Sequence, residues 1–546
     1  MAAAQVLNSP ELLLLILEHF NEQNYERTLE DLNKPRFRSA QSSLAKFARL
    51  NSLWFETATR VLWAYEKQGP TLVNLDNIET CRRQIYASKL VSIRTQDRSE
   101  YVLDTTALSF PRARKLDFQE IGREPGLPAT SIKQYLRLPI DMVDFRIWDD
   151  SFNKELLTGI KSQCPRLRSL ELTDLGKGST EIIPEDFNEF FRNQQLELVY
   201  IDVDSPLVTK ELISTFGAMK TLESLSILST LSLQQIPECF LDEGTQLFKS
   251  LHHVEVRVTR KAMRSVTMAA RNVSSAKITV KESTLGTPVF SNVKHMRNLV
   301  DLTIHLRGGY IRLNKEDFGH LRTLENLEYL VLKSDQQSAL PPTTIAMLDS
   351  SIILDAILGL PQLHSFNWHI CWLNVSVETL SALSRHNPKL RNLILYGALD
   401  LQALGKVSGC LFPNLQTLML SRTVLGGHRG QIPFKRIATQ ILNHAPKLQI
   451  LSFTEDSQSK VVNTWKKLKE EEETRLSSIT YKVVRPSQNP LRKIPLLIDG
   501  KINVDRVKRP ASAWQRVLEG KYGSRPDPSD PRWRRAEAPE PQTSSS

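Results

Sequence analysis

NPKLRNLIL at residues 387–395 and FPNLQTLML at residues 412–420 share one pattern, in which a proline precedes three spaced leucines. The pattern returns as CPRLRSLEL at residues 164–172 and, with phenylalanine last, as APKLQILSF at residues 445–453. Positions two apart point to the same side of an extended chain, so the last two apolar residues of each segment can enter one core. Each segment therefore predicts a β-strand with one buried side.

The apolar triplet of these segments recurs along most of the chain. The clear instances are Leu167/Leu170/Leu172, Leu222/Leu225/Ile227, Leu299/Leu302/Ile304, Leu327/Leu330/Leu332, Leu390/Leu393/Leu395, Leu415/Leu418/Leu420 and Leu448/Leu451/Phe453. Weaker instances are Ala113/Leu116/Phe118, Met142/Phe145/Ile147, Leu196/Val199/Ile201, Leu251/Val254/Val256, Ser275/Ile278/Val280 and Leu363/Phe366/Trp368. The middle members run from residue 116 to residue 451, and their spacing averages about 28 residues.

Stretches with helical spacing lie between the triplets. Their apolar faces are Leu156/Leu157/Ile160, Leu212/Ile213/Phe216, Ile353/Leu354/Ile357/Leu358 and Ile437/Ile441/Leu442. A proline stands just before several triplets and disfavours helical geometry in the residue that precedes it: Pro165, Pro361, Pro388, Pro413 and Pro446. No strand–helix unit of this size buries its apolar side alone, so neighbouring units must stack. An ordinary α/β domain with coincidental leucines is the alternative.

This repeat resembles the leucine-rich-repeat family, and the CPRL, NPKL, FPNL and APKL starts resemble its F-box-associated branch. The resemblance implies an α/β fold, a horseshoe-shaped solenoid with parallel strands inside the curve and helices outside. We expect the solenoid to span residues 66–456.

The N-terminal segment has a different pattern. Residues 7–20, LNSPELLLLILEHF, predict a short helix that Ser9 or Asn8 caps and in which Pro10 occupies the first turn. Residues 43–63, SLAKFARLNSLWFETATRVLW, predict two more short helices. Three short helices bury little surface, so we expect a partner or the solenoid to stabilise them.

These helices resemble the F-box family. Pro10 and Glu11 match the start of the family pattern. Ile16, Leu17 and Phe20 match its leucine-rich helix, and Leu44, Leu50 and Trp54 match its second half. The Leu62-Trp63 pair resembles the ending common in fungal F-box proteins. The resemblance implies a three-helix module, within residues 1–65, that docks the Skp-type adaptor of a cullin-RING ubiquitin ligase. The expected adaptor-binding residues are Pro10, Leu13, Ile16, Leu17, Leu50 and Trp54. A helical cap that closes the first repeat is the alternative, and it is compatible with docking.

The inner curved face of the predicted solenoid is the expected binding surface for a protein target. Residues that flank the core positions of a strand point to this face. In the early repeats they are mostly charged or small, whereas in the later ones they become amphipathic. The expected target-binding residues are Tyr329, Val331, Asn367, His369, Ile394, Tyr396 and Met419. One alternative is that helices or the tail fold over this face. The other is that the register is off by one residue, in which case these side chains belong to the core.

Charge is distributed unevenly along the chain. The net charge is +11, and +8 of it lies in residues 457–546, so the body before this extension is nearly neutral. Residues 464–476, TWKKLKEEEETRL, predict an exposed helix whose charged residues form a solvated face. From Arg525 the chain is rich in proline and serine, which predicts disorder in part of this basic extension. Nucleic-acid binding through the extension is a remaining alternative that we do not expect, because the charge is diffuse.

No nucleotide-binding, zinc-protease or hydrolase motif is present, and the five cysteines form no Cys-x-x-Cys pair. We therefore expect no catalytic residue, no metal site and no cofactor. An odd number of separated cysteines is typical of a reducing compartment, and no stretch approaches the length of a membrane span. These features predict a cytoplasmic or nuclear protein that does not enter a membrane.

Together these features predict a non-catalytic, substrate-recognition adaptor of an SCF-type cullin-RING E3 ubiquitin ligase. The F-box-like module would bind the Skp adaptor and the cullin ligase complex, and the repeats would bind a protein target. A leucine-rich-repeat scaffold that binds proteins with no ligase connection is the alternative.

Overall fold

The computed structural model describes most of the chain from Ser9 to Glu473 and two short strands beyond it. The described residues are 9–19, 44–64, 72–96, 107–121, 140–147, 154–175, 182–192, 194–203, 205–241, 247–281, 289–307, 315–335, 348–349, 351–401, 403–424, 434–453, 459–473, 497–498 and 501–502. The end of the basic extension lies outside these residues, so the disorder expected there is not tested.

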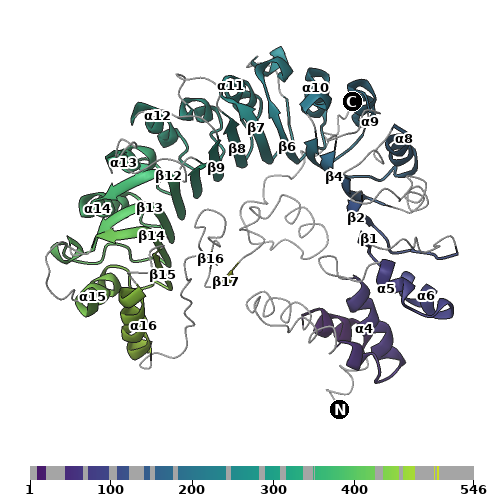
Figure 1. Cartoon of the computed structure of the whole chain (residues 1–546), viewed down its shortest axis with the longest axis horizontal. Helices are drawn as coiled ribbons and strands as arrows, with labels where there is room; N and C mark the ends of the chain where they lie inside the picture. The colour runs from purple at the N-terminus through teal and green to yellow at the C-terminus, as the bar shows by residue number, and fades with distance from the viewer. Residues whose placement is uncertain are drawn as a thin grey trace, which may run out of the picture.

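The described chain forms a horseshoe, with strands along the inner curve and helices along the outer curve (Figure 1). The strands form one fifteen-stranded parallel sheet. Each strand pairs with its neighbours along the chain, except that β10 pairs directly with β12 and β11 lies off this path and pairs with β12 alone. The strands are β1 Ser92–Gln96, β2 Lys115–Ile121, β3 Met142–Ile147, β4 Ser169–Leu175, β5 Leu198–Val203, β6 Ser224–Leu231, β7 His253–Thr259, β8 Ser275–Lys281, β9 Asp301–Arg307, β10 Tyr329–Ser334, β11 Leu348–Asp349, β12 Ser365–Val375, β13 Asn392–Asp400, β14 Thr417–Val424 and β15 Ile450–Phe453. This arrangement is a leucine-rich-repeat solenoid, as the sequence predicts.

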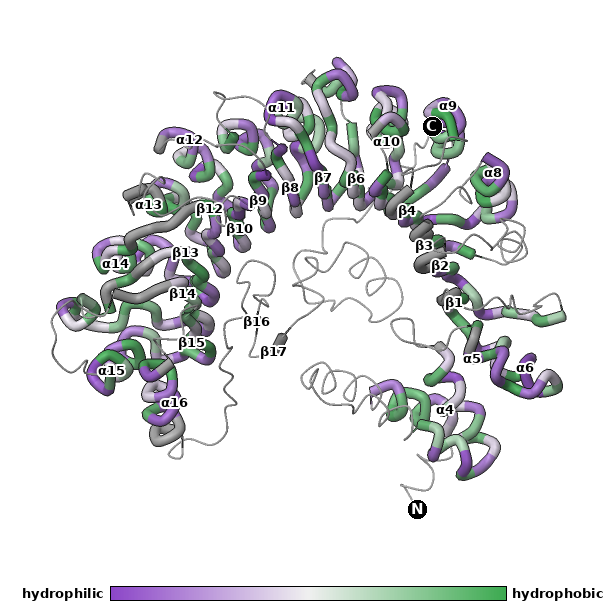
Figure 2. Tube along the Cα trace, in the orientation of Figure 1, coloured by the Kyte–Doolittle hydropathy of each residue, from purple (hydrophilic) through white to green (hydrophobic). Residues whose placement is uncertain are grey.

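The outer layer mixes α-helices with short 3-10 helices, and its helices carry both hydrophobic and hydrophilic residues (Figure 2). The α-helices are α4 Ser52–Ala64, α5 Leu72–Asp76, α6 Thr80–Ala87, α8 Lys154–Gln163, α9 Pro184–Phe191, α10 Lys210–Ala218, α11 Arg260–Ala269, α12 Lys315–Gly319, α13 Ser351–Ile357, α14 Val377–His386, α15 Phe434–His444 and α16 Ser459–Glu473. The 3-10 helices are η1 Ser205–Leu207, η2 Leu233–Gln235, η3 Glu238–Leu241, η4 Phe290–His295, η5 His320–Thr323 and η7 Ala403–Lys406. A separate antiparallel pair joins β16 Leu497–Ile498 to β17 Lys501–Ile502.

The strand register confirms most of the predicted triplets. Leu330 of β10 pairs with Leu302 of β9 and with Phe366 of β12, and all three side chains are fully buried. One continuous apolar core runs from Trp63 to Trp465. Because each unit contributes only one strand and one helical segment, the core exists only through stacking of neighbours.

Two predicted triplets are misplaced by two residues. In β3 the middle position of the triplet is Val143, not Phe145, because Val143 pairs with Leu116 and Leu170, and the first position is the buried Ile140 just before the strand. In β8 the triplet is Val273, Ala276 and Ile278, because Ala276 pairs with Val254 and Leu302; Ser275 and Val280, which the prediction included, are buried too but lie at other positions of the repeat. An alternating pattern indicates which side of a strand is buried but not where the triplet starts. In β8 the middle position is the small Ala276, so the triplet does not stand out in the sequence.

The structure also corrects the expected C-terminal end of the solenoid. In α16 the side chains of Val461 and Trp465 are fully buried, and both belong to the continuous core. The Lys469 ammonium donates to the Leu448 carbonyl and lies 5.6 Å from the centre of the Trp465 ring. The expectation of an exposed helix here is therefore wrong for this face, because the charge run hides apolar residues at helical spacing. The core continues beyond residue 456.

Candidate functional site

The N-terminal module has a small core of its own. Its first helix covers residues 10–19, and the Ser9 hydroxyl accepts a hydrogen bond from the Leu12 N–H at 3.4 Å, as a capping residue does. The buried residues of the module are Leu13, Leu17, Leu44, Ala58 and Val61. So few buried side chains stabilise a fold weakly.

This core corrects two of the expected adaptor-binding residues. Leu13 and Leu17 are 0% and 1% exposed, so they hold the module together and do not face outward. The opposite face of the helix presents three large apolar side chains: Leu12 is 43% exposed, Leu15 60% and Ile16 44%. The run from Leu12 to Leu17 is apolar on every side of the helix, and for that reason its spacing does not predict which leucines point inward.

The other expected residues divide in a similar way. Pro10 is exposed, and Leu50 is 62% exposed. Trp54 is half-buried, because its ring packs 5.4 Å from the ring of Phe47 inside the module. We call Leu12, Leu15, Ile16 and Leu50 the exposed module residues. Leu12 and Leu15 were not among the expected residues, although the sequence left open which leucine of residues 12–15 faces outward.

The structure brings the expected target-binding residues to adjacent strands of the inner face. Val331, Asn367, Ile394 and Met419 form one row across β10, β12, β13 and β14. Nearby, the ring of His369 stacks on the ring of Tyr396 at 6.2 Å and 25°. The side of the strands was therefore predicted correctly, and the alternative register that is off by one residue is excluded for these strands.

Three of these residues are less accessible than expected. Asn367, Ile394 and Met419 are each 4% exposed. Side chains on the inside of a curve crowd together because neighbouring strands lie only about 4.8 Å apart. The side chains that remain partly exposed are Tyr329, Val331, His369 and Tyr396. They are the part of the expected surface that a partner can contact.

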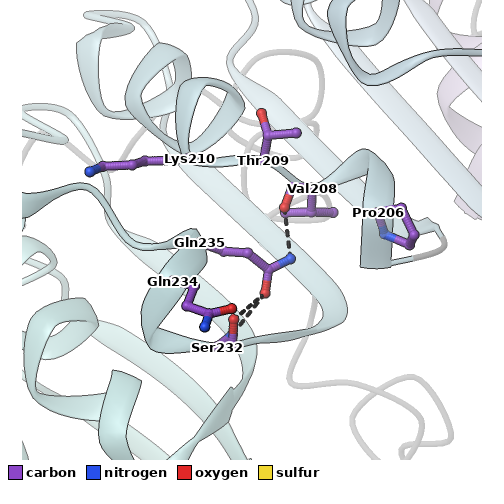
Figure 3. Close-up of a pocket in the computed structure, with 7 residues that line it drawn as sticks. All are labelled: Pro206, Val208, Thr209, Lys210, Ser232, Gln234 and Gln235. Carbon is purple, nitrogen blue, oxygen red and sulfur yellow. Dashed lines mark hydrogen bonds between the residues drawn. The ribbon is translucent and has the colours of Figure 1, made fainter.

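A shallow pocket of about 460 Å³ opens between η1 and η2 (Figure 3). It is lined by Pro206, Val208, Thr209, Lys210, Ser232, Gln234 and Gln235. The Gln235 amide donates to the Val208 carbonyl at 2.7 Å and accepts from the Ser232 N–H at 2.9 Å. These hydrogen bonds hold two successive corners of the solenoid together, so the polar groups of Gln235 have structural partners.

In the part of the chain that the structure describes, no group of three or more histidine, cysteine, aspartate or glutamate side chains is arranged to hold a metal ion. No helix among the described residues has the length and apolar character needed to cross a membrane.

Comparison with known proteins gives similar structures only. Neither a family model nor a curated protein matches the chain. A chain of the yeast Rad7 and Elc1 complex is similar at 14% identity and a TM-score of 0.36, over 76% of this chain and 91% of that one. An internalin, InlF, from Listeria monocytogenes is similar at 14% identity and a TM-score of 0.32, over 63% of this chain and 85% of that one.

A third similar structure is the leucine-rich-repeat ectodomain of the receptor kinase GASSHO1/SCHENGEN3 from Arabidopsis thaliana. It shares 13% identity and a TM-score of 0.19, over 57% of this chain and 48% of that one. At these values the comparisons say nothing about activity, and the assignment of the fold rests on the strand register and the continuous core of this chain.

Proposed function

We propose that this chain is a non-catalytic adaptor of a cullin-RING ubiquitin ligase. Its N-terminal module binds the Skp-type adaptor, and the inner face of its solenoid binds a protein target. The proposal starts from the F-box-like pattern of Pro10, Glu11, Leu44 and Trp54. The ubiquitin-transfer chemistry belongs to other subunits of such a ligase.

The observation that carries the proposal is the distribution of exposed apolar side chains. Seven large hydrophobic residues in the described part of the chain are prominently exposed, and four of them are the exposed module residues. A surface that groups leucine and isoleucine side chains in a short module is typical of a protein interface. Covering them with a partner removes apolar surface from water, at about 25 cal/mol per Å².

A scaffold without a ligase connection has its own support. Leu62 of α4 packs against both the module core and the solenoid core, so the module also closes the first repeat. A cap requires that inner contact. It does not require an exposed apolar side chain such as Leu15, which is 60% exposed on the outer side of the module. The outward leucines therefore favour docking over capping alone.

A pull-down of the intact chain, probed for the Skp-type adaptor and for cullin, tests the proposal. We expect both to be recovered with the full-length chain. Recovery of neither would contradict the ligase connection and would favour the scaffold.

A further inference from the structure

A basic cluster lies on the inner face across β7 to β12. The strand register aligns Arg257, Thr279, His305, Lys333 and His369 in one row. Lys277 of β8 lies close enough to Lys333 for their charges to repel each other. Four of the five row members carry a basic group, so this part of the face concentrates hydrogen-bond donors.

Lys333 has no counter-charge among the described residues. In the described residues its ammonium has neither a hydrogen bond nor an ion pair, although the side chain is partly buried. Burial lowers the pKa of Lys333, and the charge of Lys277 adds to this. A cation that has lost part of its water and gained no partner raises the free energy of the folded state.

Two carboxylates of this part of the chain have partners of their own. One oxygen of Asp335 lies 2.6 Å from Nε2 of His305, and the other accepts from Nε of Arg307 at 2.8 Å. Glu255 forms an ion pair with Lys277. Among the described residues, no ion pair joins an acidic side chain to Lys333.

Two further buried groups of the inner face lack partners among the described residues. The side chain of Asn367 is 4% exposed, and its Oδ1 atom makes no hydrogen bond. The Nε atom of Arg257, in the same row as Lys333, is also buried and unpaired. The two ends of an amide can exchange places by rotation, so Asn367 can present either a donor or an acceptor. Buried polar groups are usually satisfied, and a ligand can supply what the chain leaves unsatisfied.

We propose that the inner face around Lys333 binds an oxyanion carried by the protein target, either a carboxylate of an acidic segment or a phosphate ester on it. This inference rests on the proposed target-binding role of the solenoid. Lys333 supplies the charge, and Asn367, on the adjacent strand β12, supplies a directional hydrogen bond. Charge-assisted hydrogen bonds are shorter and stronger than neutral ones, and a partly buried site strengthens them further.

Calorimetric titration of the full chain tests the site. The probes are inorganic phosphate, a glycine-serine peptide with four consecutive glutamates, and the same peptide with one phosphoserine in their place; chloride and the unmodified glycine-serine peptide are the blanks. We expect phosphate and at least one charged peptide to bind. The peptide that binds more tightly identifies the source of the oxyanion.

Three variants test whether the charge of Lys333 is responsible for the binding. Lys333→Gln should weaken binding by at least about tenfold, the loss expected for one charge-assisted hydrogen bond. Lys333→Arg should retain binding, because it keeps the charge. Lys261→Gln, at an exposed lysine on the outer helix α11, should bind like the wild type.

Equal binding by Lys333→Gln and the wild type would overturn the inference, as would the absence of binding to every probe. The unfolding temperature of each variant shows whether it is folded. If Lys333→Gln is not folded, Lys333→Arg still tests the site. Adaptor binding by the same proteins keeps the two proposals separate, because Lys333→Gln should leave it unchanged.

Discussion

The ammonium of Lys89 forms an ion pair with the carboxylate of Glu56, and this contact joins the N-terminal module to the first turn of the solenoid. The Lys89 side chain is 5% exposed and that of Glu56 is 66% exposed. Next to it, the ring of Trp63 packs 5.0 Å from the ring of Tyr86 on α6. The junction is therefore mainly apolar, and the module has a fixed contact with the solenoid.

Trp63→Ala should lower the free energy of unfolding by about 3–5 kcal/mol, as the loss of a buried aromatic ring does. Denaturant unfolding measures this loss, and limited proteolysis should cut more readily near α4. A change below about 1 kcal/mol would show that the junction contributes little to stability.

Truncation after Asp456 should destabilise the solenoid, because it removes the buried Val461, Val462 and Trp465 of α16. A chain that ends after Glu473 keeps α16 and serves as the control. We expect the shorter chain to unfold at a lower temperature and to aggregate in size-exclusion chromatography. Identical unfolding temperatures for the two chains would contradict the capping role of α16.

Asp317→Asn should destabilise the convex side by about 2–3 kcal/mol, since the carboxylate accepts several charge-assisted hydrogen bonds. Its oxygens accept the backbone N–H groups of Val289 at 2.7 Å, Phe290 at 2.8 Å and Ser291 at 3.0 Å. An amide would turn a donor toward one of these groups. Denaturant unfolding measures the loss, and Glu316→Gln at the exposed neighbouring position should change stability by no more than about 0.5 kcal/mol. Equal effects of the two substitutions would contradict the role of Asp317.

His369 should make the protein less stable in acid. Burial, assisted by the charge of Lys333, lowers the pKa of His369 from 6.5 to about 4. Below pH 6.5 the unfolded chain binds a proton at this site that the folded chain does not, so stability falls as the pH decreases from 6.5 to 4. The slope from this residue is at most about 1.4 kcal/mol per pH unit.

The free energy of unfolding of the wild type and of His369→Gln, measured between pH 7 and pH 4.5, tests the role of His369. We expect the acid-dependent decrease to be shallower in the variant, whereas His386→Gln, at an exposed histidine of α14, should behave like the wild type. Parallel curves for His369→Gln and the wild type would show that another group causes the decrease.

The fold could be predicted because its information is local and repeated. A triplet such as Leu327, Leu330 and Leu332 predicts a strand and its buried side, and its repetition predicts the spacing to the next unit. The three side chains are fully buried in the structure. The first strand, β1, was missed because Leu90 and Ile93 are followed by Thr95, a polar residue at the third position.

The candidate site was less predictable because exposure depends on neighbours that are distant in sequence. Leu15 and Leu17 are chemically identical and lie in one leucine-rich run, yet one is 60% and the other 1% exposed. Only the packing of residues 10–19 against Leu44 and α4 separates them. Likewise, the sequence places Asn367 on the inner face correctly but does not reveal that adjacent strands cover it.

The affinity of the full-length chain for a purified Skp-type adaptor tests the central claim most directly. The test variant is Leu15→Asp with Ile16→Asp, and the matched control is Leu233→Asp with Ile183→Asp, at a leucine and an isoleucine that are 47% and 50% exposed on the solenoid. Burying unpaired charge in an interface costs several kcal/mol, so the test variant should bind at least about 100-fold more weakly. The control should bind like the wild type. A test variant that is folded and binds the adaptor as tightly as the wild type, or a wild type that does not bind it, would contradict the account.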